Sequence, residues 1–162
     1  MKTSRIWALI LGLLSICGNA QQPDSRATLA SFIRFVWEEK QEEAAAVTFS
    51  KPGESIASTE RIKKLIERSK EHKNTPVEIV ESKELGTVAW VIVKDSVKRP
   101  DGKPDYDGTL MIKREGVWKV VLNANELEDT PGLLDAKERK SLSELREWQN
   151  EKTKALTTPS TP

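Results

Sequence analysis

Sulfur and imidazole groups are nearly absent from this sequence, which has one cysteine, one histidine and two methionines in 162 residues. A single cysteine cannot close a disulfide within the chain, and structural zinc sites need several nitrogen or sulfur ligands. The histidine, His72, lies at the charged end of a predicted helix and belongs to no nucleophile–base motif. The sequence therefore predicts a surface position for His72, no catalytic residue, no metal site and no cofactor.

An excess of one charge is also lacking. Lys and Arg number 26, Asp and Glu number 25, and the two signs are interspersed along the chain. Binding to nucleic acid needs a concentrated basic surface that displaces counterions from the phosphates. No such surface is evident, so nucleic acid is not an expected partner.

Residues 6–16 are the apolar run that opens the chain, and they are fewer than the roughly 20 that span a bilayer. The run follows Lys2 and Arg5 and is followed by small and polar residues up to Ala20. That order is typical of a secretory signal peptide. We predict that residues 1–20 are such a peptide and that the protein is exported, to a periplasm or to the medium.

Cys17 leaves a second interpretation open. Leu14-Ser15-Ile16-Cys17 resembles the box of bacterial lipoproteins, in which the cysteine is lipidated and becomes the first residue. Ile16 is bulky where a small residue is usual, which disfavours lipidation. A third interpretation is an N-terminal anchor that stays attached. We expect the protein to contact a membrane only through this N-terminal segment or through a lipid on Cys17.

A long helix is predicted after the leader, from Asp24 or Ser25 to about residue 50. Its apolar residues recur at helical spacing, and Pro52-Gly53 ends it. The apolar stripe is broad, which favours a helix that lies across a sheet. The residues that define the stripe are Leu29, Phe32, Ile33 and Val36.

A second helix is predicted from Ser58 or Thr59, and Pro76 forbids its continuation. Ile62, Leu65 and Ile66 form its apolar face. Its other face is the most basic patch of the chain, and acidic residues are interleaved with the basic ones. We interpret this face as a solvated outer surface. Its members are Arg61, Lys63, Lys64, Glu67, Arg68 and Lys70.

From residue 77 the apolar period changes to two, which is typical of strands. Residues 88–93 are apolar at every position, as expected for a central strand covered on both faces. Glu115-Gly116 predicts a tight hairpin of the primed type, with glycine supplying a positive φ. The following strand alternates, with Trp118 on one face and Val121 on the other. The four predicted strands are residues 77–82, 88–93, 106–113 and 117–122.

The sequence thus predicts an α+β domain over residues 26–125, with the two helices packed on an antiparallel sheet of about four strands. A third helix is predicted over residues 134–152, opened by a capping box of Asp135 and Glu138. Its narrow apolar seam leaves open whether it docks weakly on the domain or binds a partner. Residues 153–162 are rich in threonine and proline and are predicted to be a disordered tail.

This order of elements resembles the nuclear transport factor two-like superfamily, and within it the exported bacterial lipoprotein-like families of unknown function. The resemblance covers the entry helix and the final strand, Lys113-Arg114-Glu115-Gly116-Val117-Trp118-Lys119-Val120. It implies a curved sheet wrapped around the long helix, a cone with an apolar pocket. Members use that cone as an enzyme site, a ligand pocket or a dimer and partner surface, so the fold does not choose among these roles.

Aromatic side chains are the candidates for the pocket wall. The alternative is that they fill the core, because both roles use the same residue types. The predicted function is a non-catalytic binding or interaction module for a small apolar ligand or a protein partner. The sequence leaves open whether the protein forms a homodimer. The alternatives are a small isomerase- or dehydratase-like enzyme using a pocket carboxylate or Tyr106, and a lipid-tethered envelope structural protein. The predicted wall consists of Trp37, Trp90, Met111, Trp118 and Tyr106.

Overall fold

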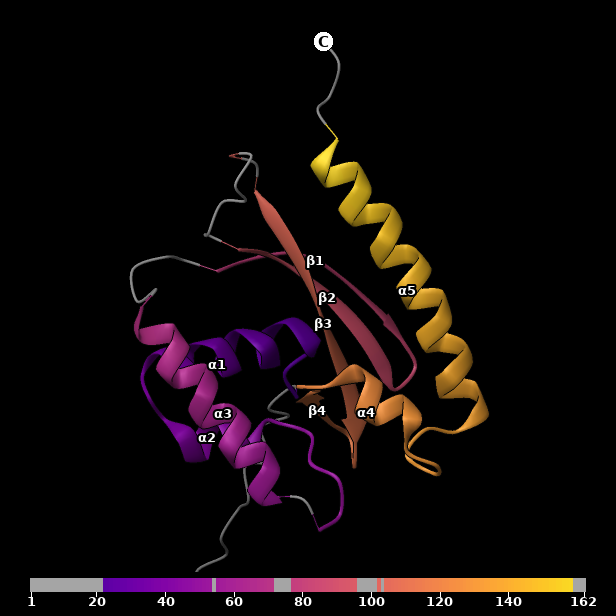
Figure 1. Cartoon of the computed structure of the whole chain (residues 1–162). Coiled ribbons are helices and arrows are strands. Elements are labelled where there is room, and N and C mark those ends of the chain that lie inside the picture. The colour runs from indigo at the N-terminus through magenta and orange to yellow at the C-terminus, as the bar shows by residue number, and fades with distance from the viewer. Residues whose placement is uncertain (1–21, 54, 72–76, 96–101, 103, 159–162) are drawn as a thin grey trace, which may run out of the picture.

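The computed structural model describes residues 22–53, 55–71, 77–95, 102 and 104–158. Helices come first, then a four-stranded antiparallel sheet, then two more helices, which confirms the α+β class. In Figure 1 the first three helices lie on one side of the sheet and α5 on the other. The helices are α1 (Ser25–Trp37), α2 (Gln41–Ala46), α3 (Ser55–Lys70), α4 (Ala124–Asp129) and α5 (Ala136–Thr157).

The sheet is a meander in the order β1-β2-β3-β4. The turn between β3 and β4 is the predicted one: Glu115 and Gly116 both have positive φ, 51° and 83°. Positive φ at both central residues is the requirement of a type I′ turn, whose twist matches that of the strands. The strands are β1 (Glu78–Leu85), β2 (Val88–Asp95), β3 (Asp105–Arg114) and β4 (Val117–Val120).

Side chains of the strands alternate between two buried faces. On the face covered by α1, α2 and α3, here called the α1 face, Ala89, Val91 and Met111 are fully buried. On the opposite face, here called the α5 face, Val88 and Ile112 are equally buried and pack with residues of α4 and α5. The central strand is therefore covered on both sides, as its unbroken apolar run predicts.

The C-terminal helix is part of the core. Leu142 and Leu145 of α5 are 2% and 0% exposed and pack on the α5 face. The narrow apolar seam predicted for this helix therefore packs on the sheet of the same chain. The helix also runs to Thr157, so residues 153–157 of the predicted tail are helical. Residues 159–162 lie outside the described residues.

The predicted entry helix is two helices. After α1 the chain turns through Glu38, Glu39 and Lys40, with Glu39 at φ 59°, and α2 begins at Gln41. The prediction of one helix was wrong here because residues 38–43 are all polar and offer no apolar contact that would hold a continuous stripe on the sheet.

The N-terminal prediction is not tested by the structure. Residues 1–20 and Cys17 lie outside the described residues, so the signal peptide and the lipid attachment stay predictions. Among the residues that are described, no helix has the length and apolarity needed to cross a bilayer.

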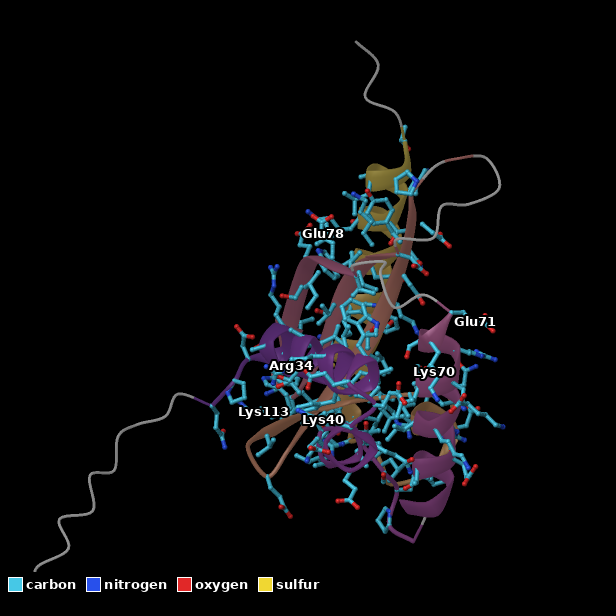
Figure 2. The ribbon with its side chains drawn as sticks, turned by 90° about the vertical axis from the view of Figure 1, so that its left-hand side faces the viewer. Arg34, Lys40, Lys70, Glu71, Glu78 and Lys113 are labelled. Carbon is cyan, nitrogen blue, oxygen red and sulfur yellow. The ribbon has the colours of Figure 1, made fainter. Side chains whose placement is uncertain are left out.

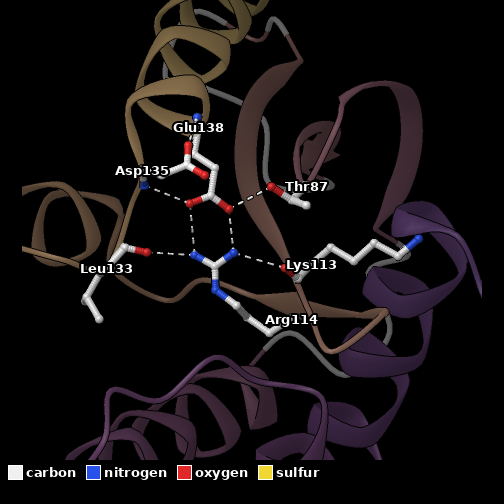
Figure 3. Close-up of polar contacts among 6 residues, drawn as sticks. All are labelled: Thr87, Lys113, Arg114, Leu133, Asp135 and Glu138. Atoms are coloured by element: carbon white, nitrogen blue, oxygen red, sulfur yellow. Dashed lines mark hydrogen bonds and ion pairs between the residues drawn. The ribbon is translucent and has the colours of Figure 1, made fainter.

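An ion pair joins α5 to the sheet (Figure 3). Arg114 at the end of β3 donates to both carboxylate oxygens of Glu138, with Nη1 2.6 Å from Oε1 and Nη2 3.3 Å from Oε2. Thr87 Oγ1 donates to the same carboxylate at 2.7 Å, and the Asp135 backbone N–H donates at 3.0 Å. The predicted capping box is present, so one carboxylate both caps α5 and binds it to the sheet.

Acid should weaken this junction. Burial by itself would raise the pKa of Glu138, but the hydrogen bonds from Arg114, Thr87 and Asp135 and the charge of Arg114 lower that pKa below its ordinary 4.5. A lowered folded pKa stabilises the protein above pH 4.5, and the contribution is lost as pH falls through the folded value. We expect Glu138→Gln to lower the free energy of unfolding by about 1–3 kcal/mol at neutral pH.

Denaturant unfolding at neutral pH and at about pH 3 measures this effect. The loss caused by Glu138→Gln should shrink at the acid pH, because the unfolded carboxyl takes up a proton below about 4.5 and the folded one follows at its lower pKa. Glu144→Gln is the control, because Glu144 is exposed on the same helix. An equal loss at both pH values would contradict the role given to the Glu138 charge.

Gly108 of β3 makes room for an indole ring. A Cβ added to Gly108 would lie 2.0 Å from Trp90 Nε1 and 2.9 Å from Trp90 Cδ1. Trp90 is 8% exposed and belongs to the core on the α5 face. The ring therefore lies directly over the glycine, where any side chain would collide with it.

Gly108→Ala should therefore destabilise the protein, by about 1–3 kcal/mol as for other overpacked sites. The same change should cost much less when Trp90 is replaced by leucine, because the smaller side chain leaves space for the methyl group. Thermal unfolding of the two single variants and the double variant measures this coupling. Strict additivity would show that the collision with Trp90 is not the cause.

Candidate ligand-binding cleft

The five residues predicted to line a pocket are divided between the two faces of the sheet. Trp118 and Met111 are 3% and 0% exposed in the core of the α1 face. Trp90 lies on the α5 face, and strand alternation puts the half-buried Tyr106 there too. Trp37 is half-buried at the end of α1 and belongs to neither core cluster. These residues do not form one wall.

The pairing of β2 with β3 is the reason. Trp90 pairs with Leu110, and the neighbouring pair, Ala89 with Met111, points to the opposite face. Lys113 pairs with Trp118 across the next hairpin, which keeps Trp118 on the side of Met111. A tryptophan on each side of a sheet cannot enclose a shared cavity.

A cleft of about 470 Å³ lies elsewhere on the α1 face. It is bounded by α1, α3 and strands of the sheet, and Figure 2 shows these two helices in front of the sheet with α5 behind. None of the five predicted side chains, all of which are described, is among the residues that line it. Its apolar lining is Leu29, Phe32, Ile33, Leu65, Val77, Val93, Val120, Val121 and Leu122.

The cleft lies where the side chains of β2 and β3 become more exposed along the strands. On the α1 face of β3, Met111 is fully buried, Thr109 is half-buried and Asp107 is exposed. On β2, Val91 is fully buried and Val93 is half-buried. The helix layer thus covers one end of the two central strands tightly and leaves their other end open.

Three cations of α3 also line the cleft. Arg61, Lys64 and Arg68 are spaced i, i+3 and i+7, which places them on one side of a helix. The sequence predicts a solvated outer surface for these residues. Lys64 and Arg68 are exposed, and all three also lie along one wall of the cleft. Their spacing predicts a shared side. What the sequence does not give is the direction in which that side points once α3 packs against α1 and α2.

Arg61 is held in place by a shared carboxylate. Its Nη1 lies 2.5 Å from Glu126 Oε2, and Lys51 Nζ lies 3.2 Å from Glu126 Oε1. One carboxylate therefore faces two cations, which leaves this corner positive. Lys64 and Arg68 are exposed and form no ion pair with any residue that the structure describes.

Asp107 is the acidic group among the described lining residues. It is exposed, and its Oδ1 accepts the backbone N–H of Gly108 at 2.7 Å. Within the described part of the chain, no three His, Cys, Asp or Glu side chains gather as a metal site would require. The described part of the cleft thus combines an apolar floor, one cationic wall and one exposed carboxylate.

Comparisons with known proteins give structural neighbours alone. No family model matches the chain, and no curated protein matches it. A putative NTF2-like transpeptidase from Campylobacter jejuni aligns with a TM-score of 0.47 at 14% identity, over 62% of this chain and 100% of that one. A de novo designed NTF2 fold protein aligns with a TM-score of 0.47 at 14% identity, over 80% of this chain and 98% of that one. Both of these neighbours are NTF2-like proteins.

Proposed function

We propose that this protein is a binding module that holds one small, largely apolar ligand in the cleft between α1, α3 and the sheet. The observation that carries the proposal is an apolar cleft of about 470 Å³ on a sheet face that is otherwise tightly packed. Sites for small molecules occupy roughly 300–1,000 Å³ and are lined mostly by apolar side chains with a few polar groups. The cleft has that size and that lining.

Half-buried apolar side chains give the ligand its binding energy. Ile33, Leu65 and Val93 line the cleft and are half-buried, so part of each side chain is accessible to water. Removing apolar surface from water contributes about 25 cal/mol per Å². A ligand that covers these three side chains therefore gains free energy without displacing any segment that the structure describes.

The exposure of Asp107 favours binding over catalysis. An isomerase- or dehydratase-like enzyme would need an acid or base tuned by burial and placed at the cavity. Asp107, the carboxylate among the described lining residues, is exposed, and Tyr106 lies on the other face of β3. The enzyme interpretation thus has less support than the binding module.

The proposed place of action is outside the cytoplasm, because residues 1–20 have the order of a signal peptide. The mass of the mature N-terminus separates the alternatives. Cleavage after Ala20 gives an unmodified chain, whereas lipidation gives a chain that begins at a modified Cys17 and is tethered to a membrane.

Filling the cleft should weaken binding. We expect Val93→Trp to raise the Kd for the uncharged apolar dye Nile red at least tenfold, which corresponds to about 1.4 kcal/mol. The indole would occupy the space above β2 while keeping a residue type that strands accept. Fluorescence titration measures the Kd, and thermal unfolding checks that the variant is folded.

Val117→Trp is the matched control. Val117 is 38% exposed on β4 and does not line the cleft. This variant should bind the dye as the wild type does. If Val93→Trp also binds Nile red with wild-type affinity, the cleft is not the binding site.

A further inference from the structure

We propose that the ligand is a soluble amphiphile with one anionic head group, a carboxylate or a similar oxyanion, on an apolar chain. Lys64 and Arg68 bind the head group, and the apolar floor takes the chain. This inference rests on the proposed function, because it specifies which kind of small molecule the cleft accepts.

The charges of the lining are unbalanced. The described lining residues include three cations, Arg61, Lys64 and Arg68, and one carboxylate, Asp107. Arg61 is matched in part by Glu126, but Glu126 also faces Lys51. The two remaining cations have no anionic partner among the described residues, so the cleft as a whole attracts an anion.

The cations and the apolar floor occupy different sides of the cleft. All three cations come from α3, whereas Leu29, Phe32 and Ile33 come from α1 and Val93 comes from β2. An amphiphile has the same separation of charge and apolar surface. Its head can lie at α3 while its chain lies against α1 and the sheet.

An uncharged ligand fits this lining less well. A molecule that covers Lys64 and Arg68 removes water from two charged groups, which costs free energy unless the ligand provides a partner. A carboxylate or another oxyanion forms charge-assisted hydrogen bonds with both residue types, and arginine can bind it in a bidentate manner. The lining therefore discriminates for an anion by penalising neutral occupants.

The size of the cleft favours a small ligand. About 470 Å³ lies within the range of sites that hold one small molecule. We therefore infer a soluble single-chain amphiphile rather than a lipid with two long chains.

Competition with Nile red tests the inference on the full chain. The competitors are dodecanoate, dodecanol and dodecyltrimethylammonium, all below the concentrations at which they aggregate. We expect dodecanoate to bind at least tenfold more tightly than dodecanol, and the cation to bind least. In a Lys64→Gln/Arg68→Gln variant this preference should fall about tenfold, and dodecanoate should lose more affinity than the uncharged Nile red does.

The charge-matched control is Lys63→Gln/Lys137→Gln, which removes two exposed lysines that do not line the cleft. It should keep the wild-type preference for dodecanoate. An equal loss in the control would show a general effect of net charge and would overturn the inference. Binding of anionic phosphatidylglycerol vesicles without binding of monomeric dodecanoate would overturn it as well.

The inference and the proposed function fail differently. If dodecanol competes as well as dodecanoate in the wild type, the anionic head group is wrong and the apolar cleft stands. If neither competitor nor Nile red binds, the proposed function itself is wrong.

Discussion

Five consecutive residues of β2, from Val88 to Ile92, are buried, so both faces of the sheet need a cover. Antiparallel sheets often leave one face to water, but a run of five consecutive buried apolar residues occupies both faces. One cover is the layer of α1, α2 and α3, and the other comes from α4 and α5. The ion pair between Arg114 and Glu138 fixes the second cover by binding the start of α5 to the end of β3.

The cleft follows from incomplete cover on the α1 face. Val91 and Met111 are sealed by the helices, whereas the polar Thr109 and Asp107 further along β3 give the helices nothing apolar to pack on. Because α3 crosses this region with Arg61, Lys64 and Arg68 toward the opening, the space has one cationic side. The same alternation that builds the core thus sets both the position of the cleft and its chemistry.

Local patterns in the sequence predicted the local structure well. Glu115-Gly116 predicted its hairpin turn because two positive φ values are the requirement of that turn. Asp135 and Glu138 predicted the start of α5 because a capping box satisfies the N–H groups that a helix start leaves unpaired. In each case the physical cause lies within a few residues of the chain.

Features that depend on distant pairing were missed. Trp90 and Trp118 were expected in one pocket, but their relative sides are set by the registers of β2 on β3 and of β3 on β4, which no single segment encodes. The basic side of α3 was identified, but its direction depends on how the helix packs through Ile62 and Ile66. Similarly, the apolar seam of α5 was identified from the sequence, but the sequence did not show that it packs on the α5 face of the sheet.

Methyl NMR during a titration with dodecanoate tests the central claim most directly. The account predicts that the shifts are confined to methyl groups that line the cleft, with Leu29, Ile33, Leu65 and Val93 changing most. The methyl groups of Leu142 and Leu145, sealed beneath α5 on the other face, should not change. Shifts centred on the α5 face, or no saturable shift in the cleft, would contradict the account.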